Sequence, residues 1–276
     1  MNKKKTIGFI VIVIALTAHI LEQKANKSTY EAFKMDCISP RKMGLYEKYI
    51  KRGIDVVCGF SAIVMLSPLY LGLAALVKLN LGSPVFFVQK RPGLIGKNGK
   101  EKIFKMYKFR TMTDTKDAQG NLLPDKMRLT RFGKWLRSTS LDELPEAFNI
   151  LNGTMSVIGP RPQLIRDITF MNSEQRRRHT AKPGLSGLAQ VNGRNAISWE
   201  EKIDWDLEYI ETVSFKKDVS ILLQTIDKAF IRKEGITDNN MITAEDYGDY
   251  LLRTGKVSKK EYIRKQECAK EILASE

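Results

Sequence analysis

Two adjacent carboxylates, Asp142 and Glu143, follow Ser140 where the pattern predicts the start of a helix. A serine N-cap with glutamate three residues later forms a capping box, which is one structural explanation for the acids. The helix is expected to run from about residue 141 to 151 and to end near Gly153. A carboxylate kept ionised by a helix N-terminus is also suited to attack a phosphoryl group.

Arginines lie in the segments around these acids. Arg137 precedes them, Arg161 stands in Gly-Pro-Arg-Pro, and Arg194 stands in Asn-Gly-Arg-Asn. An ionised acid with arginines nearby suits attack on a phosphoryl group. The chain has only two histidines and three widely spaced cysteines. Histidine-based chemistry, a zinc site and a disulfide framework are therefore disfavoured.

The charge balance indicates an anionic partner. The 276 residues contain 46 Lys+Arg and 31 Asp+Glu, a formal net charge of +15. Such an excess fits a membrane surface, a nucleic acid or a phosphorylated substrate. The length fits one catalytic domain with appendages.

Two apolar segments predict contact with a membrane. Residues 6–21 follow three lysines and are expected to anchor the chain, with a shallow interfacial segment as the alternative. In the second segment, within residues 54–79, Ser67 and Pro68 break the middle of the run. Both flanks of this run are basic, so both ends belong on the cytoplasmic side. A re-entrant helix–break–helix satisfies both facts, and a proline-kinked span is the alternative.

The rest of the chain predicts a small mixed α/β (α+β) catalytic domain with interfacial amphipathic helices. The segment 173–178 is highly charged and is expected to face solvent or lipid headgroups. The segment 183–195 is glycine-rich and is expected to form loops that approach a phosphate or base. Strands are expected at 84–89, 103–109 and 155–158, and helices at 131–137, 198–213, 218–232 and from 258 onward.

An ordered series of motifs gives the chain a family resemblance. It resembles the bacterial sugar transferases, the monotopic polyprenyl-phosphate phosphoglycosyl transferases, over roughly residues 48–233. The matching segments are 51–55, 66–69, 82–87, 107–112, 140–145, 156–162, 182–184 and 190–195. The resemblance implies a transferase domain at 48–233, a membrane segment and basic connector at 1–47, and a polar helical tail at 234–276. Lys90 and Leu188 depart from residues common in that family.

The resemblance also implies a reaction. A sugar-1-phosphate would pass from a UDP-sugar to undecaprenyl phosphate, releasing UMP, through an aspartyl-phosphosugar intermediate. This makes the chain a phosphotransferase for substituted phosphate groups, with Asp142 as nucleophile and Mg²⁺ ligand and Glu143 assisting it. The residues expected to bind substrate are Arg137, Arg161, Arg194, Lys108 and Arg110.

This reading places the catalytic domain on the cytoplasmic face of a bacterial inner membrane. The resemblance implies that the protein starts the assembly of a capsule, exopolysaccharide, O-antigen or glycoprotein glycan, alongside other glycan-assembly enzymes. No nucleic acid is expected as a partner, and the donor sugar stays open. A non-catalytic basic protein that binds membranes or nucleic acid is the alternative from another class. A hydrolase that uses the same aspartate with water as acceptor is the second alternative.

Overall fold

A computed structural model describes residues 36–193, 197–228 and 245–275. The chain separates into the units Met1–Asp36 and Cys37–Glu276, and the helices and strands of the described residues all belong to the second unit. The predicted anchor at 6–21 and residue Arg194 lie outside the described residues.

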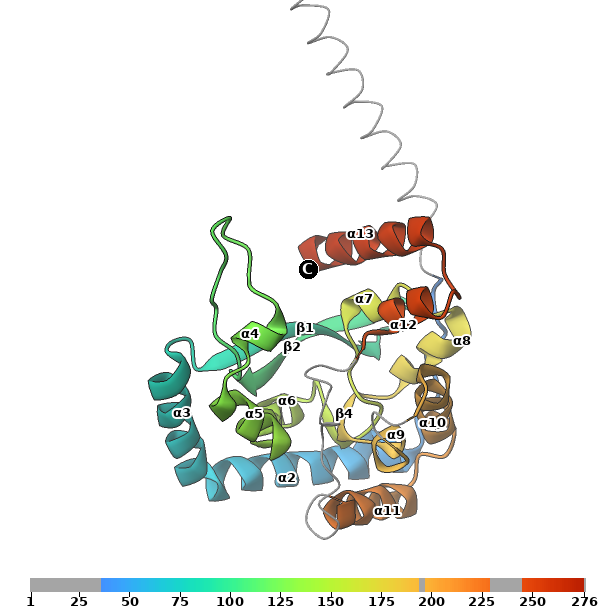
Figure 1. Ribbon diagram of the computed structural model, residues 1–276. Coiled ribbons are helices and arrows are strands. Elements are labelled where there is room, and N and C mark those ends of the chain that lie inside the picture. The colour runs from blue at the N-terminus through green and yellow to red at the C-terminus, as the bar shows by residue number, and fades with distance from the viewer. Residues whose placement is uncertain (1–35, 194–196, 229–244, 276) are drawn as a thin grey trace, which may run out of the picture. The chain divides into compact units, whose positions relative to one another are not determined.

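The second unit is a mixed α/β fold in which short helices surround two small sheets (Figure 1). Its longer helices are α2 (Lys51–Met65), α3 (Ser67–Leu81), α5 (Arg131–Ser138), α10 (Trp199–Glu211), α11 (Phe215–Ile226) and α13 (Lys259–Ser275). Its shorter helices are α4 (Asp125–Arg128), α6 (Glu146–Asn152), α7 (Ile165–Ile168), α8 (Ser173–Arg176), α9 (Leu188–Val191) and α12 (Tyr247–Arg253). Single turns of π- or 3₁₀-helix are η1 (Tyr46–Ile50), η2 (Leu141–Glu143) and η3 (Arg177–Thr180).

Two two-stranded sheets form the centre of the domain. Strands β1 (Phe86–Ile95) and β2 (Glu101–Phe109) pair antiparallel, with Phe86 opposite Phe109. Strands β3 (Ser156–Ile158) and β4 (Gly184–Ser186) pair parallel. The predicted hairpin and the predicted strand at 155–158 are confirmed. Residues 183–195 contain β4 and α9, so the prediction of loops alone was wrong there.

Helices α2 and α3 form a bent pair. The axes of Tyr46–Met65 and Ser67–Leu81 differ by 64°. In the described part of the chain no single helix has the length and apolar composition to cross a membrane, whereas this bent pair has them. The bend falls at Leu66, where Pro68 occupies the first turn of α3 and the Ser67 hydroxyl donates to the Val64 carbonyl at 2.8 Å. The predicted break at Ser67-Pro68 is confirmed.

The hairpin has one packed side and one exposed apolar side. Leu73 and Val77 of α3 pack on Phe109 and Leu136 in a buried cluster. On the other side, large apolar side chains stay exposed, of which Leu79 is the most open at 82%. Further exposed members of this surface are Val57, Phe60, Val64, Met65 and Leu71.

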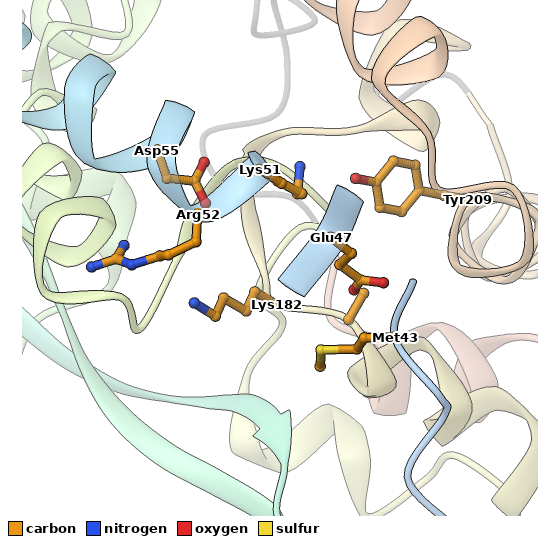
Figure 2. A pocket seen from close by; sticks show the side chains of 8 residues that line it. Met43, Glu47, Lys51, Arg52, Asp55, Lys182 and Tyr209 are labelled. Atoms are coloured by element: carbon orange, nitrogen blue, oxygen red, sulfur yellow. The ribbon is translucent and has the colours of Figure 1, made fainter. Parts of the chain in front are cut away.

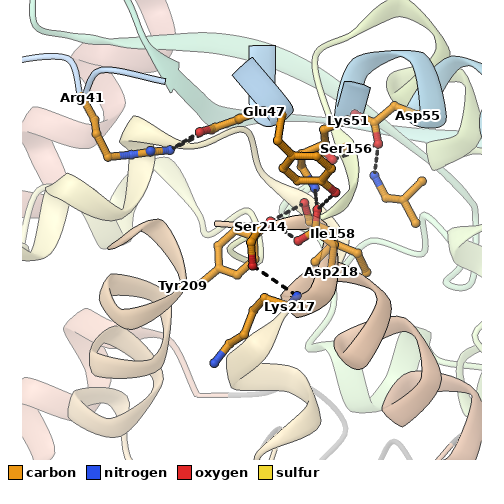
Figure 3. Close-up of polar contacts among 12 residues, drawn as sticks. Arg41, Glu47, Lys51, Asp55, Ser156, Ile158, Tyr209, Ser214, Lys217 and Asp218 are labelled. Atoms are coloured by element: carbon orange, nitrogen blue, oxygen red, sulfur yellow. Dashed lines mark hydrogen bonds and ion pairs between the residues drawn. The ribbon is translucent and has the colours of Figure 1, made fainter. Parts of the chain in front are cut away.

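A buried polar cluster fixes the base of the hairpin. Lys51 at the start of α2 pairs with Asp218 of α11 through an Nζ–Oδ2 distance of 2.5 Å. The hydroxyls of Tyr46 and Tyr209 donate to the same carboxylate at 2.7 and 2.8 Å. Figure 3 shows Lys51 and Tyr209 converging on Asp218. The charged residues at this end of the hairpin are therefore satisfied inside the protein.

Two further contacts tie α2 to the strand and helix behind it. The Asp55 carboxylate accepts hydrogen bonds from the Ser156 hydroxyl and the Val157 N–H, both at 2.9 Å (Figure 3). The Arg52 guanidinium donates to the carbonyls of Ile150 and Leu151, both at 2.7 Å. These carbonyls lie at the C-terminal end of α6, where unpaired acceptors favour a cation.

The charged segment 173–178 faces solvent only in part, because Arg176 and Arg178 are buried while Glu174 is exposed. The prediction was therefore wrong for these two arginines. Arg176 forms a bidentate pair with Glu101 of β2, at 2.9 and 2.7 Å. Arg178 donates from Nε to Asp206 of α10 at 2.9 Å. His179 bridges the two pairs, because Nδ1 lies 3.1 Å from Glu101 and Nε2 lies 3.2 Å from Arg178. The acids that permit this burial come from distant parts of the chain.

The apolar face predicted for the helix after residue 214 is exposed. Helix α11 starts at Phe215, earlier than expected, and only Ile221 of its apolar side chains is fully buried. The described members of the predicted face, Val219, Leu222, Leu223 and Ile226, remain open, and Phe230 lies outside the described residues. The capping box at Ser198 and Glu201 is confirmed.

Replacement of Glu101 by glutamine tests this buried network. The substitution leaves Arg176 without its counter-charge and should lower the free energy of unfolding by roughly 3 kcal/mol or more. Burial alone would raise the pKa of Glu101, but His179 and Arg176 lower it to about 2. The stabilisation is thus present above the unfolded pKa of about 4.3 and lost as the pH falls towards 2.

The measurement is chemical denaturation of wild type and Glu101→Gln from pH 7 to pH 2.5, with Glu174→Gln as control. Glu174 pairs with Arg177 on the surface, so its replacement should cost less than about 1 kcal/mol. Equal losses in both variants, or a Glu101→Gln loss that does not shrink at low pH, would contradict the network.

Candidate active site

Asp142 and Glu143 lie in η2, a 3₁₀-helix of one turn between α5 and α6. Ser140 adopts a left-handed backbone with φ 55° and its side chain makes no capping hydrogen bond. The predicted capping box was therefore wrong, because an N-cap residue needs an extended backbone to direct its oxygen at the helix. Helix α6 begins at Glu146, so the two acids precede the helix instead of opening it.

Glu143 is held between two cations. Its Oε1 atom lies 2.6 Å from the Lys108 Nζ atom and 2.7 Å from the NH2 atom of Arg161. Burial alone would raise the pKa of Glu143, but Arg161 and Lys108 hold it well below the usual range. Glu143 is thus a fixed negative charge that orients both cations.

Glu146 is a third acid of the cluster, which sequence reasoning did not single out. Its Oε1 atom lies 3.2 Å from the Lys108 Nζ atom, and its side chain is buried. Burial and then the charge of Glu143 raise its pKa to about 7, against the opposing effect of Lys108. The available signal was its position three residues after Glu143, which is the spacing of one helical turn.

Asp142 differs from the other two acids because, among the described residues, no hydrogen bond or ion pair is made to its carboxylate. Its side chain is largely buried, with an exposed fraction of 8%. Burial raises its pKa to about 6, while Lys108, Arg137 and Arg161 oppose the rise. A low pKa set by a helix N-terminus was expected, and burial overrides it. Asp142 therefore titrates closer to neutral pH than an exposed aspartate does.

Arg161 approaches the acids from the loop after β3. Its carbonyl accepts a hydrogen bond from Arg178 at 2.7 Å, and the carbonyl of Pro162 accepts one from Arg91 at 3.3 Å. The backbone is thereby fixed while the side chain of Arg161 stays 44% exposed. One NH2 group of its guanidinium donates to Glu143, and the exposed remainder of the group can contact a ligand.

Two other predicted substrate ligands lie in different surroundings. Arg137 donates from Nε to the Thr111 hydroxyl at 3.0 Å, and the charge of Asp142 acts on it. Burial nevertheless lowers the pKa of Arg137. Arg110 is directed to the exit of the hairpin, where it donates to the carbonyls of Ser83 and Leu81 and pairs with Asp114. These contacts account for the charge of Arg110 without a ligand.

The acids fit Mg²⁺ only together with a phosphorylated substrate. The described residues contain no group of three His, Cys, Asp or Glu side chains able to hold a metal ion. Glu143 already pairs with two cations, so Asp142 supplies the unpaired carboxylate. Mg²⁺ commonly binds through one or two carboxylates, substrate phosphates and water, and one unpaired carboxylate satisfies that pattern.

A separate small cavity lies beneath the first turn of α2 (Figure 2). Its volume is about 20 Å³, enough for roughly one water molecule. Sites for small molecules are usually 300–1,000 Å³, so this cavity does not accommodate a nucleotide-sugar. Its lining includes Met43, Glu47, Lys51, Arg52, Asp55, Lys182 and Tyr209.

Comparison with known proteins identifies the class to which this fold and site belong. Residues 46–232 match the family model described as bacterial sugar transferase. The chain therefore belongs to the bacterial sugar transferase family, and the resemblance found in its motifs is confirmed.

Individual relatives give the family relationship its extent. The sugar transferase EpsL of Bacillus subtilis (strain 168) is 46% identical over 198 residues, which cover 72% of this chain and 95% of EpsL. The UDP-glucose:undecaprenyl-phosphate glucose-1-phosphate transferase of Klebsiella pneumoniae is 39% identical over 66% of this chain and 40% of its own length. The UDP-N-acetylgalactosamine-undecaprenyl-phosphate N-acetylgalactosaminephosphotransferase of Aeromonas hydrophila is 40% identical over 64% and 43%, respectively. The chain thus spans about two fifths of the last two proteins.

Replacement of Lys108 by methionine tests the charge balance of the site. The variant leaves Glu143 and Glu146 with one cation fewer and should lower the free energy of unfolding by about 2–3 kcal/mol at pH 7.5. Lys105→Met is the matched control, because Lys105 lies on the same strand with an exposed side chain. Chemical denaturation of both variants measures the difference. A Lys108→Met protein as stable as the control would show that Lys108 does not balance the acids.

Proposed function

We propose that this protein transfers a sugar-1-phosphate from a UDP-sugar to undecaprenyl phosphate and releases UMP. The observation that carries the proposal is the unpaired carboxylate of Asp142 beside Glu143, whose charge holds Lys108 and Arg161. The names of the Klebsiella and Aeromonas relatives support the substrate class. In this proposal residues 48–233 carry the catalytic chemistry.

The first step is attack by the Asp142 carboxylate on the sugar-linked phosphorus. An oxygen–phosphorus bond forms, and the bond from that phosphorus to the bridging oxygen breaks, so UMP departs with the bridging oxygen. In the second step a phosphate oxygen of the lipid attacks the aspartyl-phosphosugar. The product is a lipid diphosphate sugar, and the carboxylate of Asp142 is restored.

The surrounding residues offset and direct charge during these steps. Lys108 and Arg161 place positive charge beside Asp142 and are held by Glu143, so they need no reorganisation as the phosphate reacts. The charge of Asp142 raises the pKa of Arg137 against the effect of burial, so the two groups lie near each other. We assign Arg137 and Arg194 to the substrate phosphates. When bound through Asp142 and the substrate phosphates, Mg²⁺ would offset further negative charge.

The test compares wild type with Asp142→Asn in magnesium-dependent UMP release from a panel of UDP-sugars. The panel includes glucose, galactose, N-acetylglucosamine and N-acetylgalactosamine donors, with and without undecaprenyl phosphate. We expect lipid-dependent release from one preferred donor and a loss of at least about 10³-fold in Asp142→Asn, because an amide is not a nucleophile. Asp204→Asn is the control, since Asp204 is an exposed acid of α10.

Each alternative predicts a different result in the same assay. Equal UMP release without the lipid would favour a hydrolase. Salt-sensitive oligonucleotide binding with no turnover of any donor would favour a basic binding protein. Full turnover by Asp142→Asn would remove Asp142 from the nucleophile role.

The proposed acceptor is a lipid, and two exposed apolar surfaces support a position at a membrane. One is the outer side of the α2–α3 hairpin and the other is the open face of α11. We place the hairpin as a re-entrant element in the cytoplasmic leaflet of the inner membrane, with the acids at the level of the lipid phosphate. The basic residues that flank the hairpin favour the cytoplasmic side.

Cysteine labelling tests the re-entrant arrangement. The native Cys37, Cys58 and Cys268 are replaced by serine, and single cysteines are introduced at Lys48 or Asn80. A re-entrant hairpin puts both positions on the cytoplasmic side, so neither reacts with an impermeant maleimide in intact cells and both react after lysis. Labelling of one position in intact cells would show a kinked span across the bilayer.

A further inference from the structure

Helices α12 and α13 lie beyond residues 46–232, which match the family model, yet they pack closely on the catalytic domain. Figure 1 shows them next to α7, and α13 contacts α7. Tyr247, Val257 and Ala269 of this segment are buried. A solvated tail would leave them exposed, so residues 245–275 form an integral part of the folded domain.

The first attachment of this segment is to α7, just after the Arg161 loop. The carboxylate of Asp167 is almost fully buried and accepts two backbone hydrogen bonds. Its Oδ2 atom takes the N–H of Leu164 at 2.9 Å, and its Oδ1 atom takes the N–H of Tyr247 at 3.0 Å. An ion pair between Arg166 and Asp246 lies beside this bridge. Asp167 therefore joins the segment to backbone that lies three residues after Arg161.

The second attachment is to the first turn of α10. The rings of Trp199 and Tyr247 pack with centroids 5.1 Å apart, and the Trp199 indole N–H donates to the Glu245 carbonyl at 3.2 Å. The Tyr250 hydroxyl donates to Glu200 at 2.7 Å, and Lys256 pairs with the same carboxylate.

The packing between these attachments leaves no free space. A Cβ atom added at Gly248 would lie 2.6 Å from the ring of Phe170, which is closer than such atoms approach. The ring of Tyr262 from α13 packs on Phe170 at a centroid distance of 5.7 Å. Helix α12 is thus seated against the residues that follow α7.

From these contacts we propose that residues 245–275 act as a clamp that positions the donor side of the active site. Tyr247 is the central positioning residue, since its N–H binds Asp167 and its ring packs on Trp199. The clamp joins the segment that follows Arg161 to the first turn of α10 and thereby fixes the backbone that carries Arg161. This inference rests on the proposed function, in which Arg161 lies beside the reacting phosphate of the UDP-sugar.

The kinetic test compares Tyr247→Ala, Tyr247→Phe and Lys270→Ala in the full-length protein, at a temperature at which all are folded by circular dichroism. Tyr247→Ala should raise the KM for the UDP-sugar about tenfold, without changing the KM for undecaprenyl phosphate. Both variants keep the backbone N–H that binds Asp167, but Tyr247→Phe also keeps the ring and loses only the hydroxyl that accepts from Gln175, so it should recover most of the donor affinity. Lys270 is exposed on α13, so Lys270→Ala is the control.

A second readout does not depend on turnover. Hydrogen exchange of the amides in 161–168 and 197–201 should speed up in Tyr247→Ala and stay unchanged in Lys270→Ala. Unchanged exchange in either segment would overturn the clamp, whatever the enzyme transfers. Equal rises in both KM values, or a lower melting temperature with unchanged KM values, would reduce Tyr247 to a stabilising residue. Loss of the proposed function is recognised separately, because the wild type would then turn over no donor.

Discussion

The active site depends on how a few buried charges share their partners. Asp142, Glu143 and Glu146 lie close together in a region of low exposure, where three unpaired carboxylates would repel one another. Glu143 takes both Lys108 and Arg161, and Glu146 keeps a longer contact with Lys108. This unequal division leaves Asp142 near two cations without binding it to either. That condition suits the role of nucleophile proposed for Asp142, because a carboxylate held in an ion pair attacks poorly.

The same use of charge extends outward from the site. Arg178 is buried against Asp206, and its guanidinium reaches the backbone carbonyl of Arg161. Glu101 and His179 complete the layer behind it. Buried ion pairs contribute little net stability, since desolvation offsets their attraction, but they fix geometry when every group is satisfied. The buried Arg178 thus fixes the backbone that carries the exposed side chain of Arg161.

Local patterns predicted much of this fold. The break at Ser67-Pro68 and the cap at Ser198 depend on neighbours within a few residues, and both are present. The β1–β2 hairpin and the helix end at Gly153 have the same local origin. The errors arose where distant partners decide. Ser140 carries the composition of a cap but a left-handed backbone, and the burial of Arg176 depends on an acid 75 residues earlier. In the site, motif resemblance selected Asp142 and Glu143, whereas the place of Glu146 in the cluster emerged only with its contact to Lys108.

The hydrogen bonds from Arg52 to the C-terminal end of α6 couple the position of the hairpin to that of the acids. Helix α6 has seven residues, so it is about 10 Å long, and its other end begins beside the acids. Because Arg52 belongs to the hairpin, α6 is a short rigid connection between the hairpin and the site. With the hairpin seated in a leaflet as proposed, its depth fixes the height of Asp142 above the lipid tails. The hairpin would then hold Asp142 at the height of a lipid phosphate at the bilayer surface.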